Sequence, residues 1–195
     1  YFILIREWLK ESHNEIPEYL NEIIYYLGQA FVLVNKNNNE NFLFNGNQIS
    51  KNIEFEDYIK RLGYNFKQES YQAGGYLFLN NKKFSLAADL GPSPDKDYSK
   101  DYQSGALSFE FMSNKNKIIT NSGYFQNPKH QLNLISKFTA SQSTVCIGNS
   151  SSVGFLKHSD GTNKVNSPLK VFEKKIISDK NFWSFEASHD GYNKR

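Results

Sequence analysis

Apolar residues change their spacing at about residue 65. Before this point they recur every three or four positions, as on one face of a helix, whereas after Tyr71 they alternate with polar residues, as along a strand. Many short alternating runs separated by polar turns are typical of antiparallel sheets packed as a sandwich. The pattern therefore predicts an α+β chain, with a helical segment at residues 1–65 and an antiparallel β-sandwich at residues 66–195.

Two helices are predicted near the N-terminus. The first follows from the helical spacing of Ile5 and Trp8, and the second begins near Pro17, which the first turn of a helix tolerates. We expect the second helix to end near Gly28, because glycine is common just after helices. Its apolar face follows the i, i+3, i+4, i+7 pattern and consists of Leu20, Ile23, Ile24 and Leu27.

The junction between the two parts is rich in asparagine. Residues 31–34 and 42–44 are apolar and flank the polar run at 35–41, which predicts two short strands around a turn. Residues 53–62 have helical spacing, and Gly63 is the expected stop of that helix.

Seven short strands are predicted in the sandwich domain. One hairpin turns at Asn80 and Asn81, a polar pair between two alternating runs. The single cysteine, Cys146, lies in an apolar run and is expected to be buried; alone it forms no intrachain disulfide and no Cys-rich metal site. The predicted strands are residues 76–79, 84–88, 107–112, 117–120, 144–147, 169–177 and 182–187.

The charge balance argues against a nucleic-acid partner. The chain has 23 Lys and Arg against 20 Asp and Glu, so the net charge is +3, and the basic residues are scattered. The longest apolar-leaning run, residues 23–34, is roughly 12 residues, short of the ~20 that a membrane helix needs. Tyr1 begins inside an apolar segment and Arg195 follows a strand-like run, so we expect both ends to be cuts, with the sandwich truncated at its C-terminal end.

Generic catalytic motifs are scarce. Gly74-Gly75 lacks the spacing of a phosphate-binding loop, and the four histidines lie far apart without metal-ligand spacing. Residues 188–190 (SHD) are not a catalytic triad, because neighbours on a strand point to opposite faces.

Several short motifs follow one another along the second part of the chain. In order they are residues 87–92 (AADLGP), 105–110 (GALSFE), 121–123 (NSG), 139–145 (TASQSTV) and 186–192 (EASHDGY). This order and spacing resemble the C-terminal domain of heparinase II/III-like polysaccharide lyases. Residues 44–46 (FNG) resemble the junction in that family between an α/α toroid and a β-sandwich. The resemblance implies that residues 1–65 are the end of such a toroid.

The resemblance implies β-elimination of a uronic-acid-containing polysaccharide as the function of the intact protein. A base removes the proton next to the uronate carboxylate, charge spreads onto that carboxylate, and an acid protonates the leaving oxygen. In the family, toroid tyrosine and histidine residues supply much of this chemistry, and those segments would lie upstream of Tyr1. An acidic polysaccharide is the implied partner, and the periplasm or cell envelope is the implied location.

Some family members bind zinc through sandwich residues that this chain replaces. The positions of their His-x-His pair are Asp101 and Gln103 here, their aspartate is Asn121, and their next histidine is Gln142. Neutral amides are poor zinc ligands but good hydrogen-bond partners. We therefore expect no zinc cofactor and a Gln103–Asn121–Gln142 hydrogen-bond network, which is either purely structural or in contact with sugar hydroxyls. A retained metal is the remaining alternative.

Five other residues are candidates for chemistry. Tyr102 is a catalytic acid or base if its pKa is lowered, and otherwise an exposed loop tyrosine. Glu110 either lines the cleft, where it would bind substrate, or caps a neighbouring segment. His189 is either catalytic or structural. Tyr124 is a candidate for stacking on a sugar ring, as is Trp183, for which core packing is the default.

Two other classes of function remain open. The loss of the family's histidine and aspartate positions suggests a catalytically degenerate glycan-binding module. Alternatively, the protein is a partner in surface-polysaccharide biosynthesis that uses the sandwich for docking. A plain adhesin would leave the helical segment unexplained.

Overall fold

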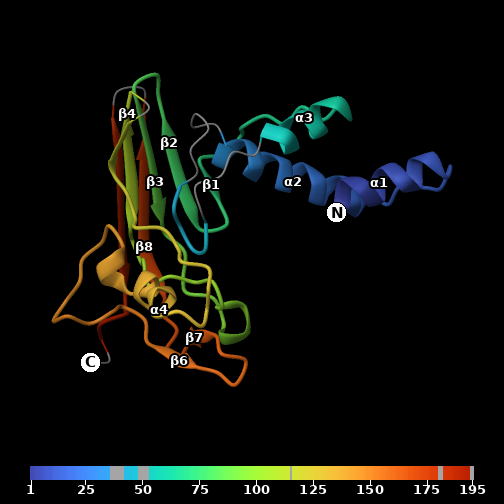
Figure 1. Cartoon of the computed structure of the whole chain (residues 1–195). Helices are drawn as coiled ribbons and strands as arrows, with labels where there is room; N and C mark the ends of the chain where they lie inside the picture. Colours follow the sequence, from blue (N-terminus) through green and yellow to red (C-terminus); the bar gives the residue numbers. More distant parts are fainter. Residues whose placement is uncertain (36–41, 48–52, 115, 180–181, 194–195) are drawn as a thin grey trace.

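Helices at the N-terminus project to one side of a domain built from strands and loops. The structure, a computed structural model, describes residues 1–35, 42–47, 53–114, 116–179 and 182–193. The first helices are α1 (Phe2–Glu11), α2 (Glu18–Asn35) and α3 (Ile53–Arg61), and Figure 1 shows them as an arm beside the strands. The helices and the antiparallel strands that follow agree with the α+β prediction.

Helix α2 continues beyond the residue at which we expected it to end. It passes through Gly28, so the predicted helix end there and the predicted strand at 31–34 are wrong. Leu33 is 1% exposed and packs with Phe42, so burial against the sheet decides the local structure. A Cβ at Gly28 would lie 2.1 Å from the Phe66 ring, so glycine serves a close approach and not a helix end.

The remaining predictions for the junction have different outcomes. The predicted strand at 42–44 has no regular structure, and residues 36–41 of the predicted turn lie outside the described residues. The helix at 53–62 and its stop are confirmed by α3. Gly63 has a φ of +81°, and N–H groups of Gly63 and Tyr64 bond back to the last turn at 3.0 Å each, as in a Schellman motif.

One five-stranded antiparallel sheet forms the centre of the second part. Its strands follow chain order, from β1 to β5. They are β1 (Gln72–Ala73), β2 (Tyr76–Asn80), β3 (Phe84–Asp89), β4 (Phe109–Ser113) and β5 (Asn116–Ile119). The predicted hairpin is confirmed by β2 and β3, and Asn81 Oδ1 closes its turn by accepting the N–H of Lys83 and Phe84 at 2.8 and 2.7 Å.

Two further strand pairs follow in the described part of the chain. The predicted pair near the C-terminus is confirmed by β8 (Val171–Ser178) and β9 (Trp183–His189). A short pair, β6 (Phe155–Lys157) and β7 (Asn163–Val165), was not predicted. The predicted strand at 144–147 is wrong: only an isolated bridge at Ile147 occurs there, and Cys146 is exposed, since no strand among the described residues covers this segment.

Both faces of the five-stranded sheet contribute buried residues, although much of β5 is exposed. Leu77, Ala88 and Phe109 point to one face and pack with residues of β8 and β9 (Figure 1). Phe78 and Met112 point to the other and pack against the end of α2 and the segment after it. The strand alternation was therefore read correctly, but covering of the second face buries its residues as well.

Glu110 on β4 lies on this second face and is 0% exposed. Its carboxylate accepts hydrogen bonds from the Thr120 hydroxyl at 2.6 Å and the Asn121 N–H at 2.8 Å, and it pairs with Lys117 at 3.3 Å. Of the two roles considered, the structure shows the cap on a neighbouring segment. A sugar contact would require the carboxylate to leave these partners.

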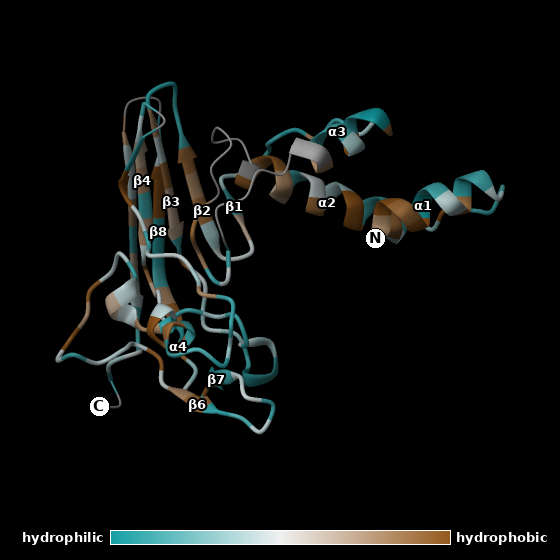
Figure 2. Ribbon diagram, in the orientation of Figure 1, coloured by the Kyte–Doolittle hydropathy of each residue, from teal (hydrophilic) through white to brown (hydrophobic). Residues whose placement is uncertain are grey.

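The helical arm keeps much of its apolar surface in solvent. Trp8 is 63% exposed and Leu27 53% exposed, and Figure 2 shows apolar residues along α1 and α2. Among the described residues, no helix is both long and apolar enough to span a membrane. Three helices do not make a toroid, so the expected α/α toroid remains a prediction.

The burial of Glu110 leads to a stability prediction. Replacing Glu110 by Ala leaves Lys117 and the Thr120 hydroxyl without their carboxylate, and breaking a buried ion pair typically costs about 3–5 kcal/mol of unfolding free energy. Glu186 is a matched control, because it also pairs across two strands with a lysine, at 3.9 Å, but both side chains are exposed. Glu186→Ala should change stability by less than about 0.5 kcal/mol. Equal effects in urea denaturation would contradict the prediction.

Candidate functional site

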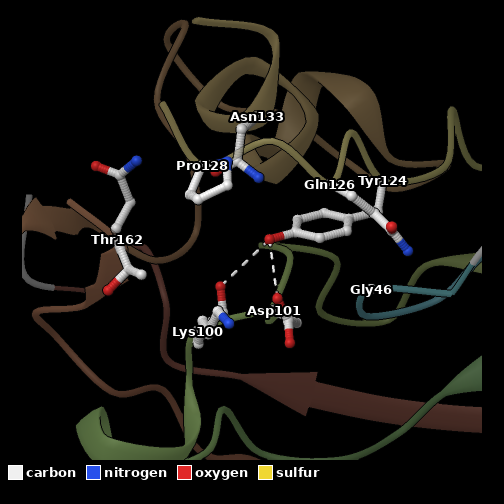
Figure 3. Close-up of a pocket in the computed structure, with 9 residues that line it drawn as sticks. Gly46, Lys100, Asp101, Tyr124, Gln126, Pro128, Asn133 and Thr162 are labelled. Carbon is white, nitrogen blue, oxygen red and sulfur yellow. Dashed lines mark hydrogen bonds between the residues drawn. The ribbon is translucent and has the colours of Figure 1, made fainter. Parts of the chain in front are cut away.

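A polar cavity of about 250 Å³ lies among the loops at one end of the sandwich domain. Figure 3 shows it enclosed by the segment after α2, the loops around Asp101 and Tyr124, helix α4 (Gln131–Lys137) and the turn before β7. The lining residues are Gly46, Lys100, Asp101, Tyr124, Gln126, Pro128, Asn133, Thr162 and Asn163.

Tyr124 and Asp101 are hydrogen-bonded to each other in the lining of this cavity. The Tyr124 hydroxyl donates to Asp101 Oδ1 at 3.0 Å and also approaches the Lys100 carbonyl oxygen at 3.5 Å (Figure 3). Burial raises the pKa of Tyr124 above its ordinary value, and the Asp101 carboxylate raises it further, although Asn133 opposes this. The phenol therefore stays protonated at neutral pH and acts as a hydrogen-bond donor, as expected of a sugar-contacting group.

Other cavity residues were missed by the sequence reasoning. Asn133 lies on α4, which is capped by the preceding His130, whose Nδ1 accepts the Leu132 N–H at 3.1 Å. Thr162 is held by the Asp160 carboxylate, which accepts its N–H at 2.9 Å and its hydroxyl at 2.6 Å. The only sequence signal was the polar composition of these turns, because their meeting depends on the folding of separate loops.

The segment after α2 reaches the cavity through Gly46. Gly46 has a φ of +84°, and a Cβ there would lie 2.8 Å from Asp101 Cβ, so only glycine fits. Its N–H donates to Gln103 Oε1 at 3.2 Å, and the neighbouring Asn45 Oδ1 accepts the Gln103 N–H at 2.9 Å. The junction motif thus lies against the strand domain at the cavity.

The two buried glutamines hold backbone segments together. Gln103 is 1% exposed, and its Nε2 donates to the carbonyl oxygens of Gly123 and Ser136 at 2.9 and 2.7 Å. Gln142 Nε2 donates to the same Ser136 carbonyl at 2.9 Å. The two amides are therefore joined through one carbonyl, and the predicted direct bonds between amides are wrong, because fixed backbone groups are the nearer partners.

Asn121 occupies a separate position in the same region. It is 1% exposed, and its Oδ1 accepts the N–H of Ser143 at 2.9 Å and the hydroxyl of the same residue at 3.0 Å. Both this oxygen and Oε1 of Gln103 are thus committed to protein donors. Zinc prefers imidazole, thiolate and carboxylate ligands, and among the described residues no three His, Cys, Asp or Glu side chains cluster for a metal. The three amide positions do not fit zinc.

Tyr102 is neither the exposed loop tyrosine nor the catalytic group that the sequence suggested; it does not line this cavity, although it is among the residues that line the adjoining cavity around Asp89. It is 5% exposed and packs in the apolar cluster with Val153 and Leu169. Burial raises its pKa well above the ordinary value, which is the opposite of what a catalytic base needs. The alternation of side chains along the loop turns its neighbour Asp101 outward and Tyr102 inward.

The last two candidates lie away from the cavity lining. His189 ends β9, and its Nδ1 accepts the Gly191 N–H at 3.1 Å; burial lowers its pKa, although Asp190 opposes this. This supports the structural alternative. Trp183 packs between β9 and the five-stranded sheet, in agreement with its default role in the core.

A second cavity of about 400 Å³ adjoins the first, and Asp101 lines both. At its base Asp89 is 4% exposed, and its carboxylate accepts the Gly91 N–H and the Asn45 amide at 3.0 Å each. Burial raises the pKa of Asp89 to about 6, against the opposing effect of these hydrogen bonds. The same Asn45 amide also donates to the Tyr76 hydroxyl at 2.5 Å.

The helices, the antiparallel sheets and the cavity define a protein whose strand domain follows a helical segment. The family model described as heparinase II/III-like, C-terminal, matches residues 65–195, and the chain belongs to this family. A crystal structure of heparinase III is similar in fold, with a TM-score of 0.56 and 11% sequence identity. The match covers 90% of this chain but only 33% of that one, so this chain spans about a third of its length. None of the curated proteins matches the chain.

The buried Asp89 carboxyl predicts a pH dependence of stability. Its pKa is about 6 in the folded state against 3.8 for an ordinary aspartate, so between these values the folded state binds more protons than the unfolded state. Its contribution to the unfolding free energy should therefore fall as pH rises through this range, by roughly 2–3 kcal/mol. The stability difference between wild type and Asp89→Asn should show this fall in urea denaturation.

Asp95→Asn serves as the control. Asp95 is an exposed aspartate in the loop after β3, and its side chain makes no capping hydrogen bond to the helical turn that follows it. A difference between wild type and Asp89→Asn that stays constant from about pH 4 to about pH 7 would contradict the assignment.

The amide positions lead to a metal-removal prediction. Since Gln103 and Asn121 hold the loops through hydrogen bonds, a chelator should leave the thermal unfolding midpoint of the intact protein unchanged. The measurement is calorimetry before and after chelation, with elemental analysis for zinc after dialysis. Stoichiometric zinc whose removal lowers the midpoint would show that the amides do not replace the metal.

Proposed function

We propose that the intact protein binds a uronic-acid-containing polysaccharide at the cavity beside Asp101 and cleaves it by β-elimination. Family membership supports a polysaccharide lyase-like activity. The observation that carries the proposal is the Asp101–Tyr124 pair, which places an acceptor and a protonated donor 3.0 Å apart in a polar cavity. Such pairs hold sugar hydroxyls and also transfer protons.

The arrangement of cavities supports a polymer as the ligand. A third cavity of about 360 Å³ shares Gly46 with the first and shares Asn45 and Tyr76 with the second, while Asp101 joins the first to the second. The three cavities therefore surround the Asn45–Gly46 turn and offer room for consecutive sugar units. Lys100 is the cation at this site for a uronate carboxylate.

The geometry favours an acid role for Tyr124 over a base role. Its raised pKa keeps the proton on the phenol, ready for donation to the leaving glycosidic oxygen, after which water returns the proton. The base that removes the uronate proton would come from the segment upstream of Tyr1. We propose that no zinc takes part and that the protein acts in the periplasm or cell envelope.

A catalytically degenerate glycan-binding module is the second candidate. It is favoured by the burial of Tyr102 and by Gln103 and Asn121, amides that stand where some family members have metal-binding residues and whose side-chain oxygens accept backbone N–H groups. In this alternative the cavity still binds the polysaccharide, but the protein does not cleave it. Glycan binding without an eliminative product would distinguish it.

The test uses the intact protein with heparin, heparan sulfate and alginate. Elimination creates a C=C bond conjugated to the carboxylate, which is followed by ultraviolet absorbance. We expect Tyr124→Phe to lower kcat by roughly 10²-fold or more, because the proton donor is lost while the ring remains. Tyr71→Phe, at an exposed tyrosine outside the cavity lining, should be neutral. Unchanged activity in Tyr124→Phe would exclude the acid role, and no product with any uronan would exclude the lyase.

A further inference from the structure

Lys137, the last residue of α4, is a buried cation behind the cavity. It is 0% exposed, although lysine is almost never fully buried unless its ammonium group has partners. It is not among the residues that line the cavity. Its burial therefore requires an explanation within the protein.

The partners of Lys137 lie on both sides of Asp101. Its Nζ donates to the carbonyl oxygen of Lys100 and, at 3.2 Å, to that of Tyr102. These residues directly precede and follow Asp101 in the chain. One ammonium group thus holds the backbone on either side of the cavity carboxylate and fixes the direction in which this carboxylate projects.

The same ammonium group also contacts Tyr124, the partner of Asp101 in the first cavity. Nζ lies 5.6 Å from the centroid of the Tyr124 ring and 5.3 Å from that of Phe155 on β6, within the range of cation–π attraction. The Tyr124 hydroxyl in turn donates to Asp101. Lys137 therefore contacts the backbone on both sides of Asp101 and the ring of Tyr124.

We propose that Lys137 is the positioning residue of this site, which holds Asp101 and Tyr124 in the arrangement that receives a sugar hydroxyl. It does not line the cavity and acts through these two residues. The assignment rests on the proposed function for its ligand, whereas the positioning itself is a property of the protein without ligand.

The charge on Lys137 makes the arrangement sensitive to alkaline pH. Burial lowers the pKa of Lys137 to about 8, with Asp101 raising it and Lys100 lowering it. The pKa values of Tyr102 and Tyr124 are raised, so these phenols stay neutral in this range. A neutral amine still donates hydrogen bonds, but it loses the attraction to the two rings and the charge-assisted strength of its bonds.

Positioning and global stability should respond to pH in opposite directions. An ordinary lysine has a pKa of 10.5, so between about 8 and 10.5 the unfolded state binds more protons than the folded state. Deprotonation of Lys137 therefore adds to the unfolding free energy as pH rises. If Tyr124 and Asp101 become less well positioned as pH rises through this range, global unfolding is not the cause, because the contribution of Lys137 to stability rises over the same range.

The first test needs no ligand. Carbon-13 NMR of labelled tyrosine rings and aspartate carboxyls in the intact protein is followed from about pH 6.5 to about pH 9.5. Signals of Tyr124 and Asp101 should share an inflection near pH 8 in the wild type, and this inflection should vanish in Lys137→Arg, whose guanidinium stays charged. Lys117→Arg, at another largely buried lysine, should keep it.

The second test measures affinity for an unsulfated uronate-containing hexasaccharide. The wild type should lose roughly fivefold in affinity between pH 7 and pH 9, whereas Lys137→Arg should hold its affinity and Lys137→Met should be weak at both values. The same inflection in Lys137→Arg, or none in the wild type, would overturn the positioning role. Absence of any glycan binding would instead refute the proposed function, and the NMR result would still decide the role of Lys137.

Discussion

At the cavity end of this domain, buried backbone groups lie in loops and lack the hydrogen bonds that a sheet would provide. The structure there depends on side chains that supply these hydrogen bonds. Between β3 and β8 the chain has long loops, and their buried N–H and C=O groups require partners as much as those of strands do. Buried hydroxyls meet part of this need: the Thr139 hydroxyl donates to the Ser104 carbonyl at 2.7 Å, and the Ser104 hydroxyl accepts the Val153 N–H at 2.8 Å. Gln103, Glu110 and Lys137 serve other segments in the same way.

This constraint gives a physical reason for amides at the positions where some family members hold zinc. A metal joins loops by coordination, whereas an amide joins them with donors and an acceptor together. Gln103 links three segments, through the N–H of Gly46 and the carbonyls of Gly123 and Ser136. Neutral hydrogen bonds of Gln103 thus join the cavity walls at positions whose amides do not fit zinc.

The same loops bring the chemistry of the site together. Asp101 and Tyr124 come from two loops, and Gly46 brings in the segment that follows the helical arm. Their arrangement rests on backbone contacts behind the cavity, chiefly those of Lys137 and Gln103. Side chains that line the cavity and side chains that hold them in place are therefore distinct sets, as expected where a site is built on irregular backbone.

The sequence by itself determined the elements whose residues interact locally. The hairpin of β2 and β3, the pair of β8 and β9, and the end of α3 at Gly63 were predicted because periodicity and turn chemistry act over a few residues. The family was also identified correctly, since short motifs keep their order along the chain whatever their contacts.

Only the tertiary structure decided what depends on distant residues. Packing of Leu33 against the sheet extends α2 through Gly28, where local propensity predicted an end. Burial turned Tyr102 into the core and left Tyr124 as the tyrosine of the first cavity, an outcome that depends on contacts with distant residues. The burial of Lys137 and its grip on the loop around Asp101 join residues about 35 positions apart in sequence, and no local pattern encodes such contacts.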